Sequence, residues 1–92
     1  MPRESGVEFY LRDELRSRGG NAIKLTGYRG IPDRLPILNG HAVFAETKTP
    51  VTDLEKAQII WHRNLAKIGF NVWVPRTRAD VRQLISYMER LP

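Results

Sequence analysis

Two acidic residues and a lysine have a spacing that could support metal-dependent hydrolysis. Asp33 follows Gly30-Ile31-Pro32, and Glu46, Thr47 and Lys48 end an apolar segment further along the chain. Two neighbouring carboxylates repel each other unless a cation or a proton lies between them. Oxygen ligands suit a hard divalent cation such as Mg²⁺. The pattern predicts a cation held by Asp33 and Glu46, with the backbone carbonyl of Thr47 as a third ligand.

Lys48 would complete the chemistry that a phosphodiester bond requires for hydrolysis. It could position or deprotonate the attacking water, or stabilise the charged transition state, and the sequence leaves these roles open. Because the three residue types are common, the motif is short enough to occur by chance. The alternative interpretation is an exposed Glu46–Lys48 pair with Asp33 at the beginning of a strand.

A hairpin would bring the two acids together. Asn39-Gly40 is a strong signal for a two-residue hairpin turn between strands predicted over 31–38 and 41–48. Counted outward from this turn, Asp33 and Glu46 stand at equal distances and would face each other. Glu46 and Lys48 are two residues apart, so they project from the same face of their strand.

The remaining elements predict an α/β domain that surrounds this hairpin. Helical periodicity predicts helices over 4–18, over 53–67 after a capping box at Thr52 and Glu55, and from Thr77 to the end of the chain. Residues 21–26, with Ile23 and Leu25 on one face, and residues 70–74 read as strands. The order αβββαβα predicts one domain, residues 1–92, with a small mixed sheet flanked by helices.

Two polar residues of the predicted helices could support the site. Glu8 lies at the edge of the apolar stripe of the first helix, where a carboxylate is costly unless it is paired or bound to a cation. Glu4, one turn earlier, could take its place. Gln58 lies beside the stripe of the second helix and could orient a water or a phosphate oxygen.

The composition favours a polyanionic partner. Lys and Arg number 15 against 10 Asp and Glu, which gives a net charge of +5, and a basic balance favours nucleic acid. There are no cysteines, which excludes disulfides and thiolate zinc sites. No apolar run is long enough to cross a bilayer, so we expect a cytoplasmic location. The candidate phosphate contacts are Arg29, Arg34, Lys56 and Arg76, with Arg12 and Arg16 as further possibilities.

The histidines and tryptophans are weaker candidates for function. His41 follows the turn and is expected to be exposed. His62 lies one turn after Gln58, where a surface position is favoured over a substrate contact. Trp61 and Trp73 are expected to fill the core or a dimer contact rather than to stack on bases.

Taken in order, these motifs resemble one nuclease family. Glu8, Gly30-Ile31-Pro32-Asp33, Phe44-Ala45-Glu46-Thr47-Lys48, Gln58 and Val72-Trp73-Val74 are similar to the VRR-NUC domain, the virus-type replication-repair nuclease of the PD-(D/E)xK superfamily. The resemblance covers nearly the whole chain. It implies a restriction-endonuclease-like core.

The resemblance also implies an activity. It implies an endonuclease with Mg²⁺ or Mn²⁺ at Asp33 and Glu46, Lys48 as the catalytic lysine, and Glu8 and Gln58 in support. Small stand-alone members resemble phage proteins and are associated with homodimers that cut four-way (Holliday) DNA junctions, which would act in the host cytoplasm. The alternative is a basic DNA-binding module without catalysis on a nuclease scaffold.

Overall fold

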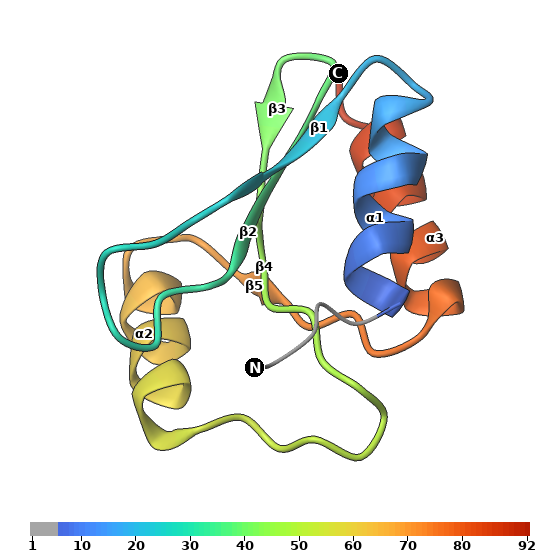
Figure 1. Cartoon of the computed structure of the whole chain (residues 1–92). Helices are drawn as coiled ribbons and strands as arrows, with labels where there is room; N and C mark the ends of the chain where they lie inside the picture. Colours follow the sequence, from blue (N-terminus) through green and yellow to red (C-terminus); the bar gives the residue numbers. More distant parts are fainter. Residues whose placement is uncertain (1–5) are drawn as a thin grey trace.

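The computed structural model describes residues 6–92, which form a small mixed sheet flanked by three helices (Figure 1). The order of elements is α1 (Gly6–Arg16), β1 (Asn21–Lys24), β2 (Arg34–Leu38), β3 (His41–Ala42), β4 (Phe44–Ala45), α2 (Lys56–Lys67), β5 (Val72–Trp73) and α3 (Arg78–Glu89). The predicted αβββαβα order is confirmed, with the third strand divided into β3 and β4. No described helix is long and apolar enough to cross a membrane.

The sheet has the strand order β1-β2-β4-β5, with β3 also paired to β2. β1, β3 and β4 run antiparallel to β2, whereas β5 runs parallel to β4. The parallel pair requires a crossover connection, and α2 provides it. Consequently β5 forms one edge of the sheet, and β4 lies between β2 and β5.

The hairpin has the register that the turn predicts. Asn39 and Gly40 both have positive φ, at 53° and 80°, as a type I′ turn requires. Leu38 pairs with His41 and Arg34 pairs with Ala45, so the same register runs the length of the hairpin. The next pair outward is Asp33 and Glu46, and the two acids therefore meet where the strands end.

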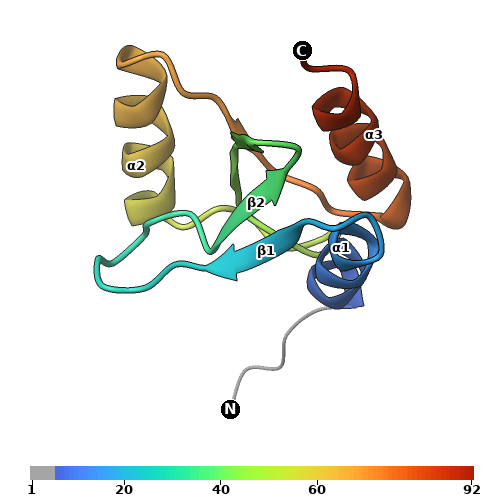
Figure 2. The same ribbon diagram turned by 90° about the horizontal axis from the view of Figure 1, so that it is seen from above.

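The hydrophobic core lies between the sheet and the pair of helices α1 and α3. Figures 1 and 2 both show α1 and α3 side by side on one side of the sheet and α2 on the other. The core consists of Leu11, Leu15, Ala22, Leu38, Ala45, Val81, Leu84, Ile85 and Met88. The closing helix begins as predicted, because Thr77 Oγ1 accepts a hydrogen bond from Asp80 N at 3.1 Å.

The predicted buried face of β1 is wrong. Ala22 is 3 % exposed, whereas Ile23 is 42 % exposed. Ala22 pairs with Pro36, whose side chain is fully buried, and α1 packs against this end of β1. The small alanine thus faces the helix, and the larger Ile23 is turned away from the core. The strand also ends at Lys24, two residues before the predicted end.

Helix α2 begins later than predicted, and most of its residues are exposed or half-buried. Its N-cap is Glu55, so the predicted capping box at Thr52 and Glu55 does not form, and residues 53–55 are not helical. Arg76 Nη1 instead donates to the carbonyl oxygens of Thr49 and Thr52, at 2.9 and 2.6 Å, and holds this segment in another path. Leu65 is the buried residue of α2, and Ile60 and Ile68 are 45 % and 69 % exposed.

Candidate active site

Asp33 lies just before β2 and is held by the segment that follows β4. Its Oδ1 accepts a hydrogen bond from Thr47 N at 3.1 Å, and its Oδ2 accepts one from Thr47 Oγ1 at 2.8 Å. Both hydrogen bonds follow from the register of the hairpin, because Thr47 comes directly after Glu46, the residue that lies opposite Asp33. Thr47 is buried, and the two bonds fix the orientation of the Asp33 carboxylate.

Glu46 continues from β4 into the buried centre of the site. It is 3 % exposed, and its backbone N donates to Trp73 O at 2.7 Å, which extends the β4–β5 pairing by one residue. Its Oε1 lies 3.7 Å from Nε2 of His62 on α2. Within the described chain neither of these two atoms has a hydrogen-bond partner. A buried carboxylate oxygen without a donor is costly.

The electrostatics of the acids show the cost of burying them together. Burial first, and then the Asp33 charge, raise the pKa of Glu46 to about 8, against the lowering effect of Lys48. Burial also raises the pKa of Asp33, although its hydrogen bonds to Thr47 oppose this. For His62, burial and then the Lys48 charge lower the pKa, so the imidazole is neutral and does not neutralise Glu46. The site therefore favours added positive charge.

Lys48 and Gln58, which were expected to assist the two acids, differ in what their side chains contact. Lys48 projects close enough to affect the pKa of Asp33, Glu46 and His62, and its backbone N donates to Pro75 O. The Gln58 side chain accepts a hydrogen bond from Glu55 N at 2.8 Å through Oε1. In this arrangement the carbonyl oxygen of Gln58 caps the N-terminus of α2.

Glu8 forms a buried ion pair with Arg34. The Glu8 Oε2 and Arg34 Nε atoms are 2.7 Å apart, and the two residues are 7 % and 6 % exposed. Arg34 Nη1 also donates to Ala22 O at 3.0 Å. The Arg34 guanidinium, predicted as a candidate phosphate contact, is thus buried and already bound to Glu8 and to the backbone of Ala22. Glu8 lies near enough to Glu46 for its charge to contribute to the raised pKa of that residue, and its role in completing the site stays a prediction. Glu4, the alternative to Glu8, lies outside the described residues.

The other predicted DNA contacts surround the beginning of α2. Arg29 and Lys56 are exposed, whereas Arg76 is half-buried and binds the 49–52 segment through Nη1. The loop that carries Arg29 packs on α2, because Trp61 Nε1 donates to Arg29 O at 3.0 Å. Gly30, with φ of +84°, allows this approach: a Cβ there would lie 2.5 Å from the α2 backbone. Asp33 is thus fixed relative to α2 as well as to the hairpin.

The acids fit a divalent cation in their chemistry. Asp33 and Glu46 offer carboxylate oxygens, and the free Glu46 Oε1 is the atom that a cation would satisfy. Across residues 6–92 no three Asp, Glu or His side chains converge into a metal cluster. Mg²⁺ is commonly bound by one or two carboxylates, with waters and phosphate oxygens in the other positions. Two acids are therefore sufficient for such a site.

A solved structure described as a VRR_NUC domain is similar to this chain. It aligns with a TM-score of 0.77 and 33 % sequence identity over 88 % of this chain and 91 % of the other. The chain belongs to the VRR-NUC family. Comparisons with protein-family profiles and with curated proteins gave no match. The restriction-endonuclease-like fold expected from the motifs is confirmed.

In this VRR-NUC domain, the sequence did not indicate that His62 lies near the acids. His62 was expected at the surface, yet its side chain is only 15 % exposed and faces Glu46. Its spacing of four residues from Gln58 was visible in the sequence and places it one turn further along the same helix face. Whether that face reaches the acids depends on how α2 docks, which the spacing does not reveal.

Proposed function

We propose that this VRR-NUC domain is a divalent-cation-dependent endonuclease that cuts branched DNA, with four-way junctions as its preferred substrate. The observation that carries the proposal is the buried Glu46 carboxylate. It lies beside Asp33, is 3 % exposed, and its Oε1 has no donor within the described residues. A purely structural acid in such a place would be expected to have a hydrogen-bond or ion-pair partner.

Asp33 and Glu46 would hold Mg²⁺, or Mn²⁺ in its place, with the Thr47 carbonyl as a further proposed ligand. When bound, the cation supplies the positive charge that a scissile phosphate and an attacking water require. The two hydrogen bonds from Thr47 keep the Asp33 oxygens in a fixed orientation. The Lys48 ammonium stabilises the negative charge that develops on the phosphate. The oxygen of a water molecule forms the new bond to phosphorus and gives up one proton, while the bond from phosphorus to one ester oxygen breaks and that oxygen takes up a proton from solvent.

The charge distribution supports DNA as the substrate. The net charge is +5, although the centre of the site is acidic. Arg29 and Lys56 are exposed near the beginning of α2 and would bind backbone phosphates, and the contacts would make binding salt-dependent. We further propose a homodimer, because two active sites related by a two-fold axis suit the paired cuts that resolve a junction.

Cleavage of labelled DNA tests the assignment. Four-way junction and duplex substrates are incubated with the wild type, with Asp33→Asn and with Lys48→Met, in Mg²⁺, in Mn²⁺ and in chelator. We expect wild-type cleavage only with a cation, and a loss of at least about a hundredfold in both variants. Asp33→Asn removes a carboxylate that would hold the cation, and Lys48→Met removes positive charge that would stabilise the transition state. Asp53→Asn, which neutralises an exposed acid, is the matched control and should cut normally.

Unimpaired cutting by Asp33→Asn, or cutting in chelator, would refute the active-site assignment. Junction binding that needs no cation and leads to no cleavage under any condition would instead favour the non-catalytic DNA-binding module. Sedimentation of the protein alone and with junction DNA tests the homodimer separately.

A further inference from the structure

The surface next to β5 and α3 carries two adjoining hollows. One has a volume of about 570 Å³ and lies along the outer face of α3. The other, of about 310 Å³, lies between residues 41–44, residues 69–71 and the end of α3. Both are lined by Trp73 and Tyr87. Because these two residues line both hollows, the hollows adjoin at the aromatic pair, and we call the two together the β5–α3 groove.

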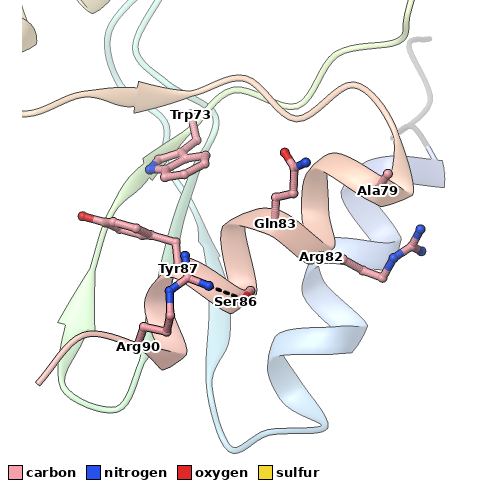
Figure 3. Close-up of a pocket in the computed structure, with 7 residues that line it drawn as sticks. All are labelled: Trp73, Ala79, Arg82, Gln83, Ser86, Tyr87 and Arg90. Carbon is pink, nitrogen blue, oxygen red and sulfur yellow. Dashed lines mark hydrogen bonds between the residues drawn. The ribbon is translucent and has the colours of Figure 1, made fainter.

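The centre of the β5–α3 groove is an aromatic pair. The rings of Trp73 and Tyr87 lie 5.1 Å apart at 45°, and Figure 3 shows Trp73 from β5 facing Tyr87 from α3. Tyr87 is 38 % exposed and Trp73 is half-buried. The rings are thus fixed by the fold, but solvent can still reach part of their surface.

Positive charge accompanies the aromatic pair. Arg82 and Arg90 line the larger hollow, together with Gln83 and Ser86. Arg90 Nη1 donates to Ser86 Oγ at 2.7 Å, as Figure 3 shows, and Arg82 Nη1 lies 3.4 Å from Tyr10 Oη. The described residues that line this hollow include no acid, so neither arginine is neutralised within it.

We infer that the β5–α3 groove binds an unpaired strand of DNA, with a base on the Trp73–Tyr87 pair and phosphates on Arg82 and Arg90. Aromatic rings in a basic groove are the general means by which proteins bind single strands, since every base can stack and every nucleotide carries a phosphate. The inference rests on the proposed function, because it assumes that the protein binds DNA. It adds to that function a DNA contact that lies away from the bond that is cut.

The groove is closely connected to the acids. Trp73 O accepts the hydrogen bond from Glu46 N at 2.7 Å, so the residue that carries the aromatic ring is bonded to the residue that carries the carboxylate. Ala45 pairs with Trp73 and is part of the core under α1 and α3, whereas Glu46 contacts His62 of α2. The larger hollow therefore lies on the α3 side of the sheet, whereas the Glu46 side chain faces α2.

The position of the groove near the β5 edge suits a DNA strand that separates from its duplex close to the bond that is cut. Neighbouring strands of a sheet are about 5 Å apart, so the path around the edge strand is short. A few unpaired nucleotides could pass around the β5 edge between the two faces. A second copy of the chain is the competing occupant, but charge complementarity favours DNA, because the groove presents two arginines and no acid within its described lining.

Binding of a fluorescent oligo-dT of about 12 nucleotides, measured by anisotropy in chelator, tests the inference. Arg82→Gln/Arg90→Gln should weaken binding and reduce the slope of log K against log salt by about 1.4, since each single-strand phosphate contact contributes about 0.7. Tyr87→Leu should weaken binding roughly five- to a hundredfold with an unchanged slope, because it removes stacking and not charge.

Arg63→Gln/Lys67→Gln, which removes two charges from exposed positions on α2, is the matched control. Equal losses in this control and in the groove variants would overturn the inference, as would wild-type binding by Tyr87→Leu. A thermal unfolding measurement on each variant checks that the variant is folded. If sedimentation shows a wild-type dimer that Tyr87→Leu dissociates, the groove is a subunit interface and the inference fails. Junction cleavage in Mg²⁺ is scored independently, so a failed groove and a failed nuclease assignment are distinguishable.

Discussion

Replacing Glu46 by glutamine should stabilise the protein in the absence of divalent cations. The pKa of Glu46 is raised from 4.5 to about 8, chiefly by burial and then by the Asp33 charge. Each unit of pKa corresponds to about 1.4 kcal/mol. An ionised Glu46 therefore costs the cation-free fold on the order of 3–5 kcal/mol, a large part of the ~5–15 kcal/mol that stabilises a small domain.

The sign of the pH dependence follows from the direction of this change. Below pH 4.5 Glu46 is protonated in the folded and unfolded states and there is no penalty. Between pH 4.5 and about 8 only the unfolded state ionises, so folding loses stability as the pH rises, and above pH 8 the penalty is constant. Glu46→Gln removes this contribution but keeps the size and shape of the side chain.

Thermal unfolding in chelator at pH 5 and at pH 8.5 measures the effect. At pH 8.5 Glu46→Gln should unfold at least about 10 °C above the wild type, because 1 kcal/mol shifts Tm by about 4–8 °C in a domain of this size. At pH 5 the two should nearly coincide. Mg²⁺ or Mn²⁺ should raise the wild-type Tm at pH 8.5 and leave the variant unchanged, since only the carboxylate binds the cation strongly.

Glu89→Gln is the control, because Glu89 is an exposed glutamate on α3, and its substitution should give no such dependence on pH. The reasoning fails if Glu46→Gln is no more stable than the wild type at pH 8.5 in chelator. It also fails if the Tm difference between Glu46→Gln and the wild type is the same at both pH values. The cause of the Tm difference would then not be the burial of an ionised group.

Three further predictions follow from contacts around the site. Arg34→Met should lower the free energy of unfolding by about 3–5 kcal/mol in urea titrations, because it deprives the buried Glu8 of its ion-pair partner; adding Glu8→Gln should recover part of the loss. Gly30→Ala should destabilise the fold more than Gly27→Ala, since both glycines have positive φ but only Gly30 abuts α2; equal Tm losses would contradict this. Thr77→Ala should cost about 1 kcal/mol by removing the N-cap of α3, and unchanged unfolding would refute the role of that cap.

The sequence by itself determined the hairpin and therefore the meeting of the two acids. Asn39-Gly40 accepts the positive φ values of a tight turn, and once the turn is fixed each pair outward follows by counting. Asp33 and Glu46 become neighbours through this local rule, without reference to any helix. The cap of α3 at Thr77 is local in the same way, because its hydrogen bonds join residues three positions apart.

Only the tertiary structure decided which partners the buried polar groups have. Glu8 and Arg34 are 26 positions apart, and their pairing depends on how α1 docks on the sheet. The position of His62 beside Glu46 depends likewise on α2, and periodicity placed it at the surface. The beginning of α2 was shifted by contacts from Arg76, which lies after β5. Local propensities are nearly neutral at such positions, so packing between distant segments determines which arrangement is stable.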